Sequence, residues 1–213
     1  MDAQDKKMAT DIAYEIIKEV SRAIRPYIGT PEAGEKVKIG ADGTPTSLID
    51  VVSEEIVVHT LKEAPVYSYI VSEEIGELRL GKGTKRAVSL TQELRRDDLS
   101  EDEKPRFIFL VDPIDGTSNA IKEIPAFAIS IAVASVPDGR VATLNDVELA
   151  FISNLANGNF FEAEKGKGCW LNNKEVRPSD VVNFSNLTLG GFTKSGTSQA
   201  SKLVDNARRM RVM

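Results

Sequence analysis

Acidic residues gather in two short stretches, each directly after an apolar run. These are VSEEIGE at 71–77 and VDPIDGTSN at 111–119. Carboxylates in one water-accessible pocket repel each other unless a cation lies between them, and their hard oxygen atoms suit Mg²⁺. Each stretch in isolation is also typical of a surface turn or an acidic helix start. Because both come where a predicted strand ends, their combination favours a shared metal site.

The second stretch has a spacing that brings its two aspartates together. Asp112 and Asp115 are three positions apart around a proline, whose fixed φ predicts that the chain leaves the strand in a defined bend there. Gly116 permits a turn that most residues resist, and Thr117 or Ser118 can start a short helix. The amides of that helix start would attract an anion. A metal beside an anion site predicts phosphate hydrolysis, in which two ions about 3.5–4 Å apart activate water.

Two other chemistries use similar residues but do not fit the spacing. Aspartyl-phosphate enzymes place two aspartates two positions apart, whereas here the spacing is three. A calcium-binding EF-hand loop needs glycine at its sixth position, but Gly116 is fifth when Asp112 is first. Both are therefore disfavoured.

Composition excludes several further classes. The formal charge of −5 and the absence of a basic stripe argue against binding to nucleic acid. A single histidine and a single cysteine leave too few ligands for the usual zinc sites, and one cysteine cannot form an internal disulfide. His59 lies in EEIVVHTLKEA and is interpreted as an ordinary helix residue. The carboxylates remain the candidate catalytic groups.

Apolar periodicity predicts two helices near the N-terminus. Residues 8–24 carry an apolar stripe with a spacing of four, and Pro26 ends it. A short strand is expected at 36–39. Thr46 or Ser47 can cap a second helix, which has its own apolar stripe from Leu48 to Leu61.

Apolar and β-branched runs predict the strands that must position the acidic residues. VYSYIVS delivers Glu73 and Glu74 at its end, and FIFLV, expected to be buried on both faces, stops at Asp112. Residues 80–106 are expected to be an exposed excursion. Further predicted elements are strands at 127–136 and 147–154, a hairpin of two short strands within 157–176, a strand at 186–192, a helix at 195–210 and the start of a strand at 211–213.

These motifs, in this order, resemble the inositol monophosphatase family. The resemblance is carried by DPIDGTSN followed by PAFAISIAVA, by VSEEIGE, and by the hairpin sequence FFEAEKGKGCWLNNKEV. GADGTPTSLIDVVSEE further resembles the archaeal members, several of which hydrolyse both inositol phosphates and fructose 1,6-bisphosphate. The family consists of Mg²⁺-dependent, lithium-sensitive sugar phosphatases related to fructose-1,6-bisphosphatase. The resemblance therefore implies two or three Mg²⁺ ions and inhibition by lithium.

The resemblance also implies roles for individual residues. Glu73, Asp112 and the carbonyl of Ile114 would hold the first metal, and Asp112 and Asp115 would share the second. Asp50 would hold a water or a third, weaker metal. The remaining assignments are a supporting carboxylate at Glu74, orientation of the attacking water by Thr117 with help from Glu73, substrate binding at Gly116, Thr117 and Ser118, and a lysine near the lithium-sensitive site at Lys38.

The expected fold is α/β, an α+β layered αβαβα sandwich of the sugar-phosphatase type with two N-terminal helices on a largely antiparallel sheet. Residues 1–185 would form the domain with the metal site, and 186–213 would begin an incomplete C-terminal α/β layer. Family members continue through a tryptophan–aspartate motif whose aspartate completes the second metal site. Trp170 is interpreted as a packing residue, and no residue after Met213 supplies that aspartate. The chain is therefore expected to be either truncated or incompletely recorded, and to be a poor catalyst as written.

The predicted function is hydrolysis of a small sugar or polyol phosphomonoester, inositol 1-phosphate or fructose 1,6-bisphosphate, by metal-activated water. Alternatives are 3′-phosphoadenosine 5′-phosphate or NADP as substrate, or a catalytically inactive fragment that binds metal or phosphate. The resemblance implies a homodimer. No nucleic-acid polymer or membrane partner is expected, and a cytoplasmic location is predicted because the N-terminus lacks an unbroken apolar run.

Overall fold

The computed structural model describes residues 1–41, 43–82, 104–183, 188–189 and 211–212. The chain divides into two compact units, Met1–Val176 and Arg177–Met213, which are described separately. The predicted helix at 195–210 and most of the predicted excursion at 80–106 lie outside the described residues. The expected division between residues 185 and 186 stays a prediction.

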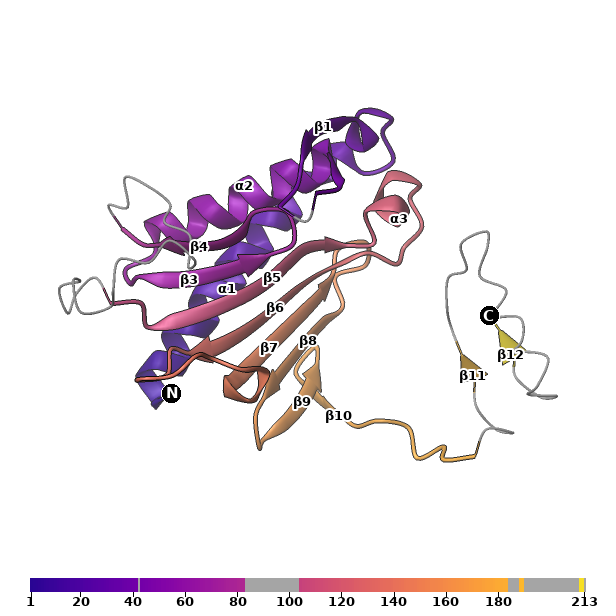
Figure 1. Ribbon diagram of the computed structural model, residues 1–213. Helices are drawn as coiled ribbons and strands as arrows, with labels where there is room; N and C mark the ends of the chain where they lie inside the picture. The colour runs from indigo at the N-terminus through magenta and orange to yellow at the C-terminus, as the bar shows by residue number, and fades with distance from the viewer. Residues whose placement is uncertain (42, 83–103, 184–187, 190–210, 213) are drawn as a thin grey trace. The chain divides into compact units, whose positions relative to one another are not determined.

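Two helices form one layer of the first unit (Figure 1). Helix α1 spans Ala3–Ile24, and its start is capped by the Asp2 carboxylate, which accepts from the Asp5 N–H at 2.8 Å. Helix α2 spans Leu48–Glu63 with Ser47 as its N-cap residue. Both predicted helices are confirmed. The described part of this unit also contains the short 3₁₀ helices η1 (Arg25–Tyr27), η2 (Glu32–Gly34) and η6 (Leu144–Asp146).

An eight-stranded sheet forms the other layer, in the order β10-β9-β8-β7-β6-β5-β3-β4. Strands β3 and β5 are parallel, and all other neighbours in this sheet are antiparallel. A separate two-stranded sheet pairs β1 with β2. The strand bounds are β1 Lys36–Ile39, β2 Pro45–Ser47, β3 Ser68–Ser72, β4 Gly76–Leu80, β5 Phe107–Asp115, β6 Ala128–Ser135, β7 Val147–Asn154, β8 Phe160–Glu164, β9 Gly168–Leu171 and β10 Lys174–Val176.

The core lies between the two helices and the sheet face that they cover (Figure 1). Side chains of β5 alternate between this face and the other one: Phe107 and Phe109 are buried, whereas Ile108 and Leu110 are only partly buried. The prediction that FIFLV is buried on both faces is therefore wrong within Met1–Val176, because helices cover a single face there. The large, fully buried apolar side chains are Phe107, Phe109, Phe151, Ile16, Ile24, Ile49, Leu61, Ile70, Leu80, Ile129 and Ile131.

Strand β5 continues three residues beyond its predicted end. Asp112 pairs with Ser130 and Asp115 with Ala128, so one extra residue of β5 is accommodated between these pairs. The proline at 113 lacks an N–H and is tolerated in a strand at such an irregularity. The chain turns instead at Gly116, which has φ 91° and starts helix α3 (Thr117–Ile121). The predicted short helix is confirmed, but the bend comes after Asp115 and not at the proline.

The predicted hairpin at 157–176 contains three strands, β8, β9 and β10, and not two. Asn172 and Asn173 lie in the left-handed region, with φ 49° and 65°, between β9 and β10. Two such residues form the tight turn that joins antiparallel strands with the usual twist. This Asn-Asn pair was the sequence signal for the additional strand.

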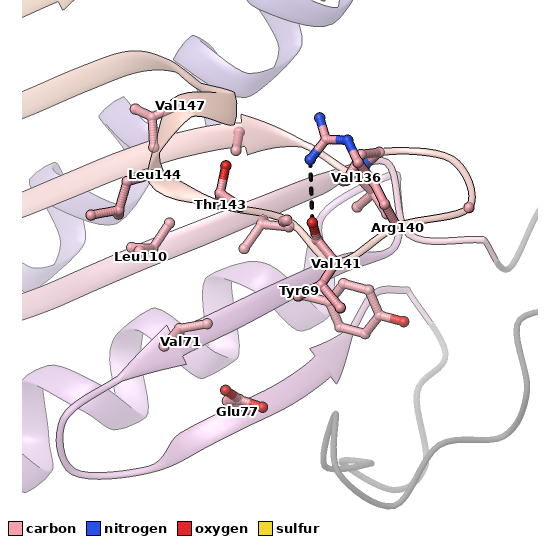
Figure 2. A pocket seen from close by; sticks show the side chains of 15 residues that line it. Tyr69, Val71, Glu77, Leu110, Val136, Arg140, Val141, Thr143, Leu144 and Val147 are labelled. Atoms are coloured by element: carbon pink, nitrogen blue, oxygen red, sulfur yellow. Dashed lines mark hydrogen bonds between the residues drawn. The ribbon is translucent and has the colours of Figure 1, made fainter.

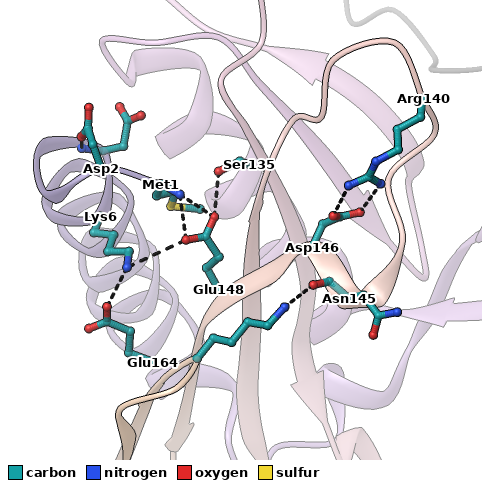
Figure 3. A network of polar contacts seen from close by, with 11 residues as sticks. Met1, Asp2, Lys6, Ser135, Arg140, Asn145, Asp146, Glu148 and Glu164 are labelled. Atoms are coloured by element: carbon teal, nitrogen blue, oxygen red, sulfur yellow. Dashed lines mark hydrogen bonds and ion pairs between the residues drawn. The ribbon is translucent and has the colours of Figure 1, made fainter.

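Ion pairs tie the start of α1 to the sheet (Figure 3). The N-terminal ammonium contacts the Glu148 carboxylate at 2.6 Å, and Lys6 Nζ contacts Glu164 at 2.8 Å. Glu148 also accepts a hydrogen bond from Ser135 at 3.0 Å. The start of the first helix is therefore fixed to β7 and β8 by charge as well as by apolar packing.

In the second unit, β11 (Thr188–Leu189) and β12 (Arg211–Val212) form a parallel pair. Both lie within segments that were predicted to be strands. Within the described residues, no helix is both long and apolar enough to cross a membrane.

Candidate active site

The parallel pairing of β3 and β5 brings the two acidic stretches to the same sheet edge. Ser72 pairs with Val111, so the next residues along each strand, Glu73 and Asp112, follow side by side. Both residues line a cavity of about 510 Å³ whose walls include Val71, Leu110 and Ser130. The convergence expected from the sequence thus has a structural basis in strand register.

Glu73, Asp112 and Asp115 are referred to below as the acidic centre. Burial raises the pKa of Asp112 to about 6, and the negative charges of Asp115, Glu73 and Asp50 add to the rise. The N–H of Ile114 donates to Asp112 Oδ1 at 3.2 Å, and this hydrogen bond lowers the pKa of Asp112 in part. The surroundings of Asp112 therefore disfavour its ionised form.

Thr117 is held by a hydrogen bond between two distant parts of the chain. Its hydroxyl donates to Asp50 Oδ1 at 2.7 Å. The hydroxyl oxygen of Thr117 also lies 3.3 Å from the carbonyl oxygen of Ile114, a second, longer contact. Asp50 is itself fixed at the start of α2, where its other oxygen accepts from the Ser47 N–H at 3.3 Å. The predicted help from Glu73 stays a prediction, because the observed partner of the Thr117 hydroxyl is Asp50.

Gly116 is the residue that permits this arrangement. Its φ of 91° is in the region that other residues rarely adopt, and an added Cβ would lie 2.8 Å from the carbonyl oxygen of Ala126. Beyond it, Ser118 is exposed at the start of α3. The roles of Gly116, Thr117 and Ser118 in substrate binding stay predictions.

Glu74 contacts the β1–β2 hairpin through both its side chain and its backbone. Its carboxylate accepts from the hydroxyl of Thr46 on β2, and its backbone carbonyl accepts from the N–H of Ala41 at 2.9 Å. Thr46 also pairs with Lys38 across the small β1–β2 sheet. Glu74 therefore joins the acidic turn to the β1–β2 hairpin, as a supporting carboxylate would.

Sequence reasoning missed Glu54, which lies on α2 behind this turn. It is buried, accepts a hydrogen bond from Ser72, and lies 3.6 Å from Lys38 Nζ. The signal was its position one helical turn after Asp50, on the helix face that also contains Ile49 and Val57. A single acidic residue on such a face is otherwise unremarkable in a sequence.

The donor set has the chemistry for a hard divalent cation, because carboxylates and a backbone carbonyl are oxygen ligands. Burial and the neighbouring carboxylates together raise the pKa of Asp112, and the positive charge of such an ion would oppose both effects. Among the residues that the structure describes, however, no three His, Cys, Asp or Glu side chains are gathered into a ready-made metal site. The residues therefore fit the ion by type, and the positions of the ligands around it stay a matter of proposal.

A second cavity, of about 850 Å³, lies toward the other end of β5 (Figure 2). Its lining is mainly apolar, and its charged members are Glu77 and Arg140. It contains none of the predicted site residues. We assign the candidate site to the smaller cavity because Glu73 and Asp112 line it.

The order of these motifs matches the profile of the inositol monophosphatase family over residues 5–211. The chain belongs to the inositol monophosphatase family. This membership confirms the resemblance noted in the sequence and the expected α/β fold.

Several family members are named for their phosphatase activity. The fructose-1,6-bisphosphatase/inositol-1-monophosphatase of Methanothermobacter thermautotrophicus is 39% identical over the whole chain, which spans 70% of that relative. The bifunctional NADP phosphatase/NAD kinase of Methanocaldococcus jannaschii is 36% identical over 85% of the chain, which spans 32% of that relative. The family is thus one of phosphoric monoester hydrolases, and both of these relatives are archaeal.

Solved structures of the inositol monophosphatase family share the architecture. One described as an inositol monophosphatase–fructose 1,6-bisphosphatase has a TM-score of 0.66 and 26% identity, and the alignment covers 95% of this chain and 67% of that one. A protein from Pyrococcus horikoshii, described as similar to inositol-1 monophosphatase, has a TM-score of 0.61 and 28% identity and is covered over 64% of its length.

Proposed function

We propose that the chain carries the site of a Mg²⁺-dependent phosphatase for small sugar or polyol phosphomonoesters. The observation that supports this most directly is the fixed Thr117 hydroxyl, which is bonded to Asp50 at 2.7 Å beside a group of mutually repelling carboxylates. Family membership supports the reaction class.

Glu73, Asp112, Asp115 and the Ile114 carbonyl would hold the ion. When bound there, Mg²⁺ supplies positive charge that neutralises these carboxylates and the phosphate oxygens. The acidic surface would otherwise repel the substrate, because the chain carries a net charge of −5.

The side chains of this chain would orient and deprotonate the attacking water. The Thr117 hydroxyl donates its hydrogen bond to Asp50, so its oxygen can accept a hydrogen bond from the attacking water. The water oxygen attacks phosphorus and the bond from phosphorus to the alcohol oxygen breaks. The proton that the water loses passes through Thr117 toward Asp50, and the alcohol takes a proton from solvent.

Two substrate classes deserve direct comparison. Inositol 1-phosphate and fructose 1,6-bisphosphate follow from relatives that are named for both activities. NADP is the second candidate, because two archaeal relatives, 30% and 36% identical, are bifunctional NADP phosphatase/NAD kinases. Inhibition by lithium, a homodimer, hydrolysis of 3′-phosphoadenosine 5′-phosphate and the inactive-fragment alternative stay predictions.

Phosphate release from these substrates, with and without Mg²⁺, tests the proposal. We expect Mg²⁺-dependent release, reduced about 100-fold or more in Thr117→Val, which removes the oriented hydroxyl. Thr117→Ser is the matched control and should keep most of the activity, because it retains the hydroxyl. Binding of Mn²⁺ without turnover of any of these substrates would instead favour the inactive fragment.

A further inference from the structure

Glu54 carries a charge in a place where charges are costly. Its side chain is 1% exposed and lies on the buried face of α2, between Ile49 and Val57. A carboxylate in such surroundings is retained at low cost only when it is paired and hydrogen-bonded. Its partners therefore indicate what the charge is for.

The two oxygens of Glu54 have different partners. Oε1 accepts from the hydroxyl of Ser72, at the end of β3. Oε2 lies 3.6 Å from Lys38 Nζ and has no hydrogen-bond partner among the described residues. Burial raises the pKa of Glu54 overall, and the charge of Glu74 adds to the rise; the contacts with Ser72 and Lys38 oppose it and favour the ionised form.

Both partners adjoin the acidic turn after β3. Ser72 immediately precedes Glu73 of the acidic centre. Lys38 pairs across β1–β2 with Thr46, whose hydroxyl donates to the carboxylate of Glu74. Glu54 is thus connected to both sides of the turn.

Lys38 is the part of this arrangement that could interfere with the site. Its side chain is 38% exposed, and its ammonium is a mobile point charge on a flexible stem. Without a counter-ion it would be attracted to the carboxylates nearby and would compete with a divalent cation for them. The Glu54 carboxylate gives it a nearer partner.

We propose that Glu54 is a positioning residue: its buried carboxylate holds the Lys38 ammonium back and fixes Ser72, so that the acidic centre stays available to a divalent cation. The inference rests on the proposed function, and it assigns Glu54 a role that acts through Lys38 and Ser72. Glu54 does not touch substrate in this role.

The test measures Mn²⁺ binding to the full chain by calorimetry, without substrate. Glu54→Gln keeps an oxygen that can accept from Ser72 but removes the charge, and we expect about tenfold weaker binding, the lower end of the range for outer partners of metal ligands. Lys38→Met alone should bind Mn²⁺ within about twofold of the wild type, because the wild-type ammonium is already neutralised. The Glu54→Gln/Lys38→Met double variant should recover the affinity of Lys38→Met.

Glu55→Gln is the matched control, because Glu55 is the exposed neighbour on the same helix and the charge change is identical. It should bind Mn²⁺ like the wild type. Melting curves of all variants report whether they fold, and Lys38→Met keeps the test decisive should Glu54→Gln fail to fold.

Unchanged Mn²⁺ affinity in Glu54→Gln, or a double variant as weak as Glu54→Gln, would overturn the inference. So would a large loss in Lys38→Met, since Lys38 would then assist binding directly. A wild-type chain that binds no Mn²⁺ would overturn the proposed function itself and this inference with it.

Discussion

At the scale of single residues, Asp112 lies where a negative charge is unfavourable. It is placed beside Asp115 and Glu73 in a half-buried position, where its ionised form is unfavourable. A side chain selected for stability alone would not be charged there. In the proposed function, this cost is that of a ligand kept ready for a cation.

The pKa of Asp112 predicts a stability change with pH in the metal-free protein. Because this pKa is about 6 in the folded chain against an ordinary value of 3.8 for an aspartate, the folded state binds the proton more tightly. The wild type should therefore lose stability as pH rises from about 4 to about 6. Asp112→Asn should be more stable than the wild type by about 1 kcal/mol above that range, after allowance for solvent screening.

Urea unfolding in a chelator, at about pH 4 and about pH 8, measures this difference. The two proteins should have nearly equal free energies of unfolding at the lower pH. Asp180→Asn, which changes an exposed aspartate outside the acidic centre, should follow the wild type at both. A less stable Asp112→Asn at the higher pH would show that the charge is favourable and would contradict the repulsion.

At the scale of elements, the turn from β5 into α3 determines where Thr117 lies. Gly116 combines a positive φ with a close approach to the chain before β6, so neither the turn nor the space allows a side chain. The Asp50–Thr117 hydrogen bond then depends on α2 being held against the sheet by its apolar face.

Gly116→Ala should therefore destabilise the chain by about 2 kcal/mol, since it adds both backbone strain and a clash. The comparison is Gly158→Ala, because Gly158 has a similar φ of 75° but open space around its Cβ position. Gly158→Ala should cost only about 1 kcal/mol, the strain alone. Equal losses in chemical denaturation would mean that crowding at Gly116 contributes nothing.

Local patterns predicted most elements and the two acidic stretches, because apolar period and turn residues are local properties. They misplaced the end of β5, since a bulge around the proline depends on how β6 pairs with it. They also missed the Thr117–Asp50 bond and the burial of Glu54. Those contacts join residues that are 67 and 18 positions apart, so no local window contains both partners.

At the scale of the whole molecule, the described part of the first unit has helices on one face of its sheet, and the two cavities described above are lined largely by residues of the other face. The site residues come from α2, the turn after β3, and the end of β5. A ligand that binds them must therefore stabilise the packing of these elements together.

Mg²⁺ should raise the free energy of unfolding of the wild type at neutral pH. For an ion at about 100 times its dissociation constant, the gain is about 2.7 kcal/mol. Asp112→Asn should gain much less, because it has lost a proposed ligand and a charge that would attract the ion. NaCl at matched ionic strength separates binding from screening, and an equal gain with NaCl would mean that no specific site exists.

The order of the strands also bears on how the chain reaches this structure. From β5 to β10 every strand pairs with the next one along the sequence, and such neighbours can form early because little chain must be closed. Strand β3 can join β5 only by a longer-range encounter, which is slower. We therefore expect Glu73 to meet Asp112 late in folding, so a partly folded chain with most of its sheet already formed would still lack the pair that we propose to bind the metal.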